Sequence, residues 1–182
     1  MSDTAQGLKK ILDGAPSGTK TYALMDCALQ SHTTYPAVQN SGCPSRCLYG
    51  ESWQAGLVDV APYLIELDPT AKFSNELLTW DWYGNWGYFV QSAASLDDCA
   101  QAFMPLTTAT LPDRSEAFFR LQDPRVLRDF LQTASADNLK VLFAKASRLV
   151  VPMADDGTSN EGAIVYTLEK GALHKTETRF GA

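Results

Sequence analysis

The sequence predicts an α/β protein, with a mixed sheet flanked by helices and a short C-terminal lobe of helices and strands. Short apolar runs of strand length alternate with stretches of helical periodicity, a pattern typical of helices packed on a mixed or parallel sheet. The junction at 118–127 shows the pattern most clearly, because an apolar run leads directly into a capped helix. The composition, 45% hydrophobic and 20% charged residues, is that of a packed globular protein.

The first half of the chain predicts two helices, four strands and a long loop. Residues 3–13 form an amphipathic pattern, which stops at the Gly and Pro residues of segment 14–18. Residues 22–26 are apolar on both faces, as in a buried strand, whereas 30–46 are rich in Ser, Thr, Pro and Gly and predict a loop. The remaining elements expected here are a brief strand at 48–49, a strand at 61–67, a helix from a Ser74 cap to about Trp80 and an aromatic strand at 86–90.

The second half predicts three helices and three strands. Ser95 begins a pattern that resembles a capping box, and a helix follows to about Met104. A loop at 105–112 precedes a strand at 115–121, and the polar tail from Lys175 is expected to fray. The other elements expected are helices at 124–134 and, capped by Ser135 or Asp137, to about Ser147, then strands at 149–151 and 163–168.

Length and charge limit the classes of protein to consider. A chain of 182 residues predicts one domain, 1–182, with a division into lobes 1–113 and 114–182 as the alternative. A formal net charge of −6 argues against nucleic acid and anionic membrane surfaces as partners. Apolar runs fall short of the ~18 residues that span a bilayer, and Met1–Asp13 has no apolar signal region. We therefore expect a cytoplasmic protein.

The four cysteines are expected to be reduced thiols that hold no metal. Cys43 and Cys47 form the one close pair, but three residues separate them, where a redox motif has two. A zinc site would need further ligands, and the chain has only two histidines. No cofactor is expected.

Motifs for catalysis are weak. Residues 14–21 superficially suggest a phosphate loop, but Thr19 interrupts the required Gly-Lys step, and a helix precedes the segment where a strand is needed. A nucleophile elbow is missing, and His32 and His174 lie in segments expected to be polar or frayed. The sequence predicts that the protein is not an enzyme. A small hydrolase or transferase with an unrecognised site, or a small-ligand domain using the tryptophan cluster, remain the alternatives.

The densest aromatic patch spans residues 80–89 and contains three of the four tryptophans. It has two interpretations, core packing around a Gly-Asn turn or a partner-binding groove, since Trp and Tyr are enriched at interface hot spots. Strand alternation places Trp86 on the same face as Tyr88, and Trp82 and Tyr83 are expected to be the most exposed. The predicted partner-binding residues are Trp80, Trp82, Tyr83, Trp86 and Tyr88. Helices at 124–147 are the alternative cargo surface.

A group of charged residues is predicted to be architectural. Asp123 precedes Pro124, and an Asp followed by Pro is a favourable start for a helix. Arg120 and Arg125 flank this cap, and Asp26, at the end of the first predicted strand, is a plausible partner for one of the arginines.

These residues also carry a resemblance. Arg120, two residues, then Asp-Pro-Arg-Val-Leu resembles the signature of the type VI secretion effector-chaperone family, domain of unknown function 4123. Similar stretches occur in order between about Tyr22 and Phe143, and they are 22–26, 48–51, 60–64, 86–89 and 111–113. The resemblance implies a cytoplasmic bacterial adaptor that holds a toxic effector and helps to load it onto the VgrG spike, without catalysis or a cofactor.

The chain departs from the family pattern in two places. The cysteine pair of the 30–46 segment is not a recognised family feature, and the chain ends soon after the motif, where larger members carry a more extensive helical lobe. The second departure affects how large an effector surface the protein can cover.

Overall fold

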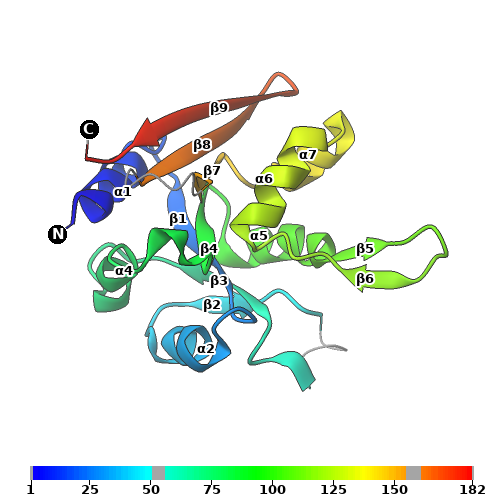
Figure 1. Ribbon diagram of the computed structural model, residues 1–182, viewed down its shortest axis with the longest axis horizontal. Helices are drawn as coiled ribbons and strands as arrows, with labels where there is room; N and C mark the ends of the chain where they lie inside the picture. Colours follow the sequence, from blue (N-terminus) through cyan, green and yellow to red (C-terminus); the bar gives the residue numbers. More distant parts are fainter. Residues whose placement is uncertain (1, 51–55, 155–160, 182) are drawn as a thin grey trace.

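The computed structural model describes residues 2–50, 56–154 and 161–181, and a sheet with helices on both faces dominates it (Figure 1). The predicted α/β class, with helices flanking a sheet, is confirmed. The helices are α1 (Asp3–Asp13), α2 (Ser31–Asn40), α4 (Lys72–Leu77), α5 (Leu96–Phe103), α6 (Pro124–Thr133) and α7 (Ala136–Leu142), with 3-10 turns η1 (Trp82–Gly84) and η2 (Met104–Thr107). The strands are β1 (Lys20–Asp26), β2 (Ser45–Cys47), β3 (Pro62–Glu66), β4 (Gly87–Ser92), β5 (Thr108–Thr110), β6 (Glu116–Phe118), β7 (Arg148–Pro152), β8 (Gly162–Glu169) and β9 (Ala172–Arg179).

The main sheet has seven strands in the order β2-β3-β1-β4-β7-β8-β9. Every pairing between its described strands is antiparallel, whereas the alternation of helices and strands favoured a mixed or parallel sheet. The reason is strand insertion. The units β1–α2–β2 and β3–α4–β4 each connect two strands of the same direction, but β3 lies between β1 and β2, and β1 lies between β3 and β4. Each helix thus connects two strands of the same direction, as in a parallel fold, but neighbouring strands in the sheet run in opposite directions.

Both faces of the sheet are buried, which explains why β1 is apolar without interruption from Tyr22 to Met25. One face, with Leu24 and Val90, packs against α5, α6 and α7. The other face, with Met25 and Phe89, packs against α1, α2 and α4. The seven-stranded sheet contains strands from both of the predicted lobes, 1–113 and 114–182. Whether the chain forms one domain or two lobes stays a prediction.

Several predicted elements are confirmed together with their caps. Residues 3–13 form α1, and the predicted cap residue Ser95 accepts a hydrogen bond from the Asp98 amide at the start of α5. Ser135, rather than Asp137, caps α7 and accepts from the Asn138 amide. The strand expected at 115–121 is shorter and forms β6, which pairs with β5 in a separate hairpin that projects from the body (Figure 1).

Several local predictions are wrong. The strand expected at 48–49 is not formed, since β2 is Ser45–Cys47, and the loop expected at 105–112 contains η2 and β5. Residues 31–40 form α2 and not a loop, because Thr34 and Val38, one turn apart, are both buried and anchor the helix despite its polar composition. Ser74 lies inside α4, which begins at Lys72, and it does not cap the helix. The tail from Lys175 does not fray, because β9 pairs with β8 along its whole length. Within the described residues, every helix is too short or too polar to cross a membrane.

Candidate functional site

The predicted aromatic patch is largely part of the protein core. Trp82, Trp86 and Tyr88 have exposed fractions of 1%, 4% and 0%, so the expectation that Trp82 is exposed is wrong. Trp80 and Tyr83 are half-buried. Partner binding through the cluster therefore stays a prediction only for Trp80 and Tyr83.

The turn at 82–83 holds β8 against the rest of the fold. The indole N–H of Trp82 donates to the Gly162 carbonyl oxygen at 3.1 Å, and the Gly162 amide donates to the Tyr83 hydroxyl at 2.9 Å. The Trp82 ring stacks on Phe89 with a centroid distance of 5.4 Å. Because one glycine is bound through both its polar backbone atoms, these two aromatic residues fix where β8 begins.

Trp86 and Tyr88 lie on opposite faces of the sheet, contrary to the alternation predicted for this strand. Trp86 packs in the same core cluster as Phe89, whereas Tyr88 packs in the other. Gly87, between them, has φ of +149°, and a Cβ atom there would lie 2.0 Å from the Leu24 carbonyl oxygen. Only glycine tolerates this conformation and this approach, and the unusual backbone breaks the alternation.

Asp26 and Arg120 form a partly buried ion pair that joins two distant segments. Arg120 Nη2 lies 2.5 Å from Asp26 Oδ2, and the Asp26 side chain is fully buried. The other carboxylate oxygen of Asp26 accepts from the Ala28 amide at 3.0 Å. The hydrogen bond to Asp26 raises the pKa of Arg120, so the guanidinium stays charged. The predicted pairing of Asp26 with one of the motif arginines is confirmed.

Asp123 caps α6 as predicted. Its carboxylate accepts from the Arg125 amide at 2.9 Å and binds the Arg125 guanidinium through Nε at 3.0 Å and Nη2 at 2.6 Å. Burial alone would raise the pKa of Asp123, but the hydrogen bonds and the charge of Arg125 outweigh it and hold the pKa below its usual range. Pro124 occupies the first helical turn and is buried. The four charged groups of the motif are therefore paired as Asp26–Arg120 and Asp123–Arg125, although the buried Nε of Arg120 has no hydrogen-bond partner among the described residues. This pairing is an arrangement suited to architecture.

Two exposed apolar side chains lie on the β5–β6 hairpin beside this motif. Phe118 is 44% exposed, and its ring contacts Tyr49 with a centroid distance of 5.0 Å. Leu111, in the connection between the two strands, is 43% exposed. The hairpin thus presents apolar surface, although its strands are short.

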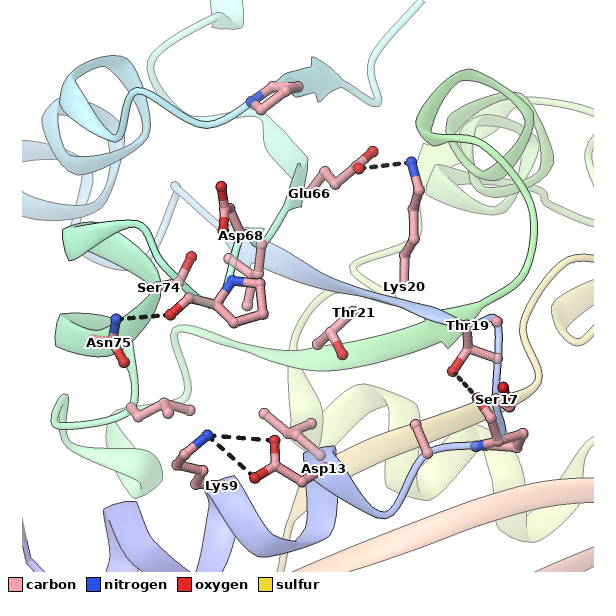
Figure 2. Close-up of a pocket in the computed structure, with 18 residues that line it drawn as sticks. Lys9, Asp13, Ser17, Thr19, Lys20, Thr21, Glu66, Asp68, Ser74 and Asn75 are labelled. Carbon is pink, nitrogen blue, oxygen red and sulfur yellow. Dashed lines mark hydrogen bonds and ion pairs between the residues drawn. The ribbon is translucent and has the colours of Figure 1, made fainter.

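One cavity of about 670 Å³ lies between the end of α1, the start of β1 and α4 (Figure 2). Two ion pairs line it, Lys9 with Asp13 and Lys20 with Glu66, and the Asn75 amide group donates to the Pro69 carbonyl. These polar groups are paired with one another (Figure 2). None of the three tryptophans that the structure describes lines this cavity, so it does not match the small-ligand site expected for the aromatic cluster.

A second hollow, of about 870 Å³, lies between α6 and the outer strands β8 and β9, and we call it the α6–β8–β9 groove. Sequence analysis did not find it, because the strand that forms one wall was expected to fray. The signal was present in the alternation of Leu173, Lys175, Glu177 and Arg179, which places these side chains on one face of a strand. The groove includes α6, part of the alternative cargo surface expected at 124–147.

The candidate groups for catalysis do not converge. His32 and His174 are exposed on separate elements, α2 and β9. Burial raises the pKa of Cys99 and Cys47, and it raises the pKa of Cys27 to about 12, which opposes thiolate formation. The four cysteines are free thiols, and among the described residues His, Cys, Asp and Glu do not gather into a group of three that can hold a metal.

The comparison with protein families identifies the class of domain. Residues 21–140, about two thirds of the chain, match the family described as domain of unknown function DUF4123, and the chain belongs to this family. The matched region includes the Asp26–Arg120 pair, the Asp123 cap and the aromatic turn, while α1 and β7 to β9 lie outside it. Neither the curated proteins nor the solved structures with which the chain was compared include a match.

Proposed function

We propose that the protein is an adaptor of bacterial type VI secretion, which binds a toxic effector in the cytoplasm and helps to load it onto a VgrG-type spike protein. The family match over residues 21–140 carries this proposal, because adaptors of this kind are what the DUF4123 resemblance implies.

The arrangement of side chains supports binding rather than catalysis. The motif charges are paired in Asp26–Arg120 and Asp123–Arg125. The first pair joins the segment before α6 to the end of β1, and the second pair lies within the start of α6. A catalytic site instead needs titratable groups that converge on a substrate position. The motif thus serves to hold a surface in place, and cargo binds to that surface without a cofactor.

The direct test is reconstitution of the complex. The toxin and the spike protein encoded beside this gene are purified and mixed with the chain, and the products are separated by size-exclusion chromatography with light scattering. The proposal predicts a binary complex with the toxin and a ternary complex when the spike is added. If the chain joins neither protein while both are folded, the adaptor function is wrong.

A further inference from the structure

The floor of the α6–β8–β9 groove is apolar. Leu131 of α6 and Ile164 and Tyr166 of β8 provide most of it, and each is 6% exposed. Leu173 and Met153 extend the floor and are partly exposed. A floor of this kind accepts the apolar side of a partner without rearrangement of the core.

The rim of the groove is basic, in contrast to the whole chain. Four basic and two acidic residues line the groove, whereas the formal net charge of the protein is −6. The basic residues are Arg125, Arg128, Lys175 and Arg179, and the acidic ones are Asp129 and Glu177. Two of the basic residues already have acidic partners, Arg125 with Asp123 and Lys175 with Glu177 at 2.9 Å. With Asp123 counted, the groove still has four basic against three acidic groups, a small local excess of positive charge in an acidic protein, and this excess favours a negatively charged occupant.

Arg128 is the most informative of these charges. Its Nη1 donates to the Pro152 carbonyl oxygen at 2.8 Å, and that contact orients the guanidinium without neutralising it. The side chain of Arg128 is half-buried, and this partial removal from water lowers the pKa of its guanidinium. An anionic group bound nearby would compensate this desolvation.

We propose that the α6–β8–β9 groove binds an acidic, amphipathic segment of a protein partner, with its apolar side on the floor and its carboxylates toward Arg128 and the basic residues of β9. A polar polyanion such as a nucleic acid would leave the apolar floor uncovered. Identifying the segment as part of the secreted toxin rests on the proposed function.

The probe is a pair of synthetic peptides of about 18 residues, with leucines at helical spacing and either glutamates or lysines elsewhere. Each is titrated into the full-length ¹⁵N-labelled protein and followed by NMR. The glutamate peptide is expected to shift amide signals of α6, β8 and β9, and raising the salt from about 0.05 to 0.5 M is expected to weaken its binding about tenfold.

The decisive variant is K175E/R179E, which reverses two exposed charges on β9. We expect it to bind the glutamate peptide at least about tenfold more weakly than the wild type. The control K9E/K72E makes the same change in net charge at exposed positions of α1 and α4, and it should stay within about twofold of the wild type. Lys175→Ala, a milder change, serves as the second variant if the double reversal disturbs the NMR spectrum.

Four results would overturn the proposal: no binding of the glutamate peptide, equal binding of the lysine peptide, shifts confined to other elements, or equal loss in the control. Tight binding of a single-stranded oligonucleotide with the same shifts would indicate a nucleic-acid groove instead. The titration uses no toxin, so it tests the groove independently of the adaptor function. If the protein binds the peptide but no toxin, the groove is a binding site and the toxin is not its ligand. If K175E/R179E binds the toxin as well as the wild type does, the groove is not the toxin-binding site.

Discussion

Asp123 stabilises the protein at a single position through two interactions, a helix cap and an ion pair with Arg125. We expect Asp123→Ala to lower the free energy of unfolding by at least about 0.5–2 kcal/mol, because a lost N-cap alone has this effect. Thermal or urea unfolding measures the change. Asp129→Ala, at an exposed position of the same helix, is the control and should be near neutral. Equal stability of both variants would contradict an architectural role for the motif.

The lowered pKa of Asp123 also predicts how stability depends on pH. Because the folded state holds this pKa below the unfolded value of about 3.9, the ionised carboxylate stabilises the fold at neutral pH. That contribution is lost as the pH falls below about 4 and through the folded pKa. Between about pH 5 and 2 the wild type should therefore lose more stability than Asp123→Asn, which has no charge to titrate. Parallel curves for the two proteins in urea unfolding would show that Asp123 does not contribute in this range.

Tyr88 offers a contrasting case, since its hydroxyl is fully buried and has no hydrogen-bond partner among the described residues. Tyr88→Phe removes an unsatisfied polar atom, so we expect unchanged stability or a gain of up to about 2 kcal/mol. Tyr22→Phe is the matched control, because the Tyr22 hydroxyl donates to the Ala94 carbonyl oxygen at 2.7 Å. The control should lose about 1 kcal/mol. Urea unfolding that ranks the two variants the other way would show that Tyr88 has a partner in solution.

At the scale of elements, the aromatic turn connects the family domain to the strands that follow it. We expect Trp82→Phe to keep most of the stacking on Phe89 but to lose the hydrogen bond to Gly162. Hydrogen exchange at the start of β8 should then accelerate, with smaller changes in β1 and β3. Trp80→Phe, in a half-buried side chain of the same cluster, is the control. If exchange in β8 does not change, the turn does not anchor this strand.

Local rules predicted the elements whose signal lies within a few residues. The caps at Ser95 and Asp123 are read directly from sequence, because a cap bonds to its own first turn. The Asp26–Arg120 pairing was also predictable in outline from charge. Three wrong predictions depended on contacts that a local pattern does not contain. The helix α2 depends on the burial of Val38, β9 on its pairing with β8, and the position of Trp86 on the close approach of Gly87 to Leu24.

The prediction that the aromatic patch is exposed was wrong for a related reason. A cluster rich in Trp and Tyr is equally typical of an interface and of a core, and the chain position of the patch does not distinguish them. The decisive contact, from Trp82 to Gly162, joins residues 80 positions apart. Sequence reasoning also missed the α6–β8–β9 groove, because the groove exists only once β9 extends the sheet.

The whole molecule is a scaffold in which the sheet continues beyond the family domain. The match ends at residue 140, yet β7 pairs with β4 of that domain, and β8 and β9 extend the sheet from there. The groove proposed for an acidic segment lies where α6, inside the match, meets β8 and β9, outside it. The groove is thus formed by one helix of the family domain and by the two C-terminal strands that follow that domain.

The central claim is that this protein carries a toxin to the secretion machinery, and secretion itself tests it most directly. In the organism that encodes the protein, the gene is deleted in frame, and the spike and any toxin encoded near the gene are measured in the culture medium. The account predicts that the toxin disappears from the medium, that the spike is still exported, and that the wild-type gene in trans restores toxin export. Undiminished export of every neighbouring toxin from the deletion strain would contradict it.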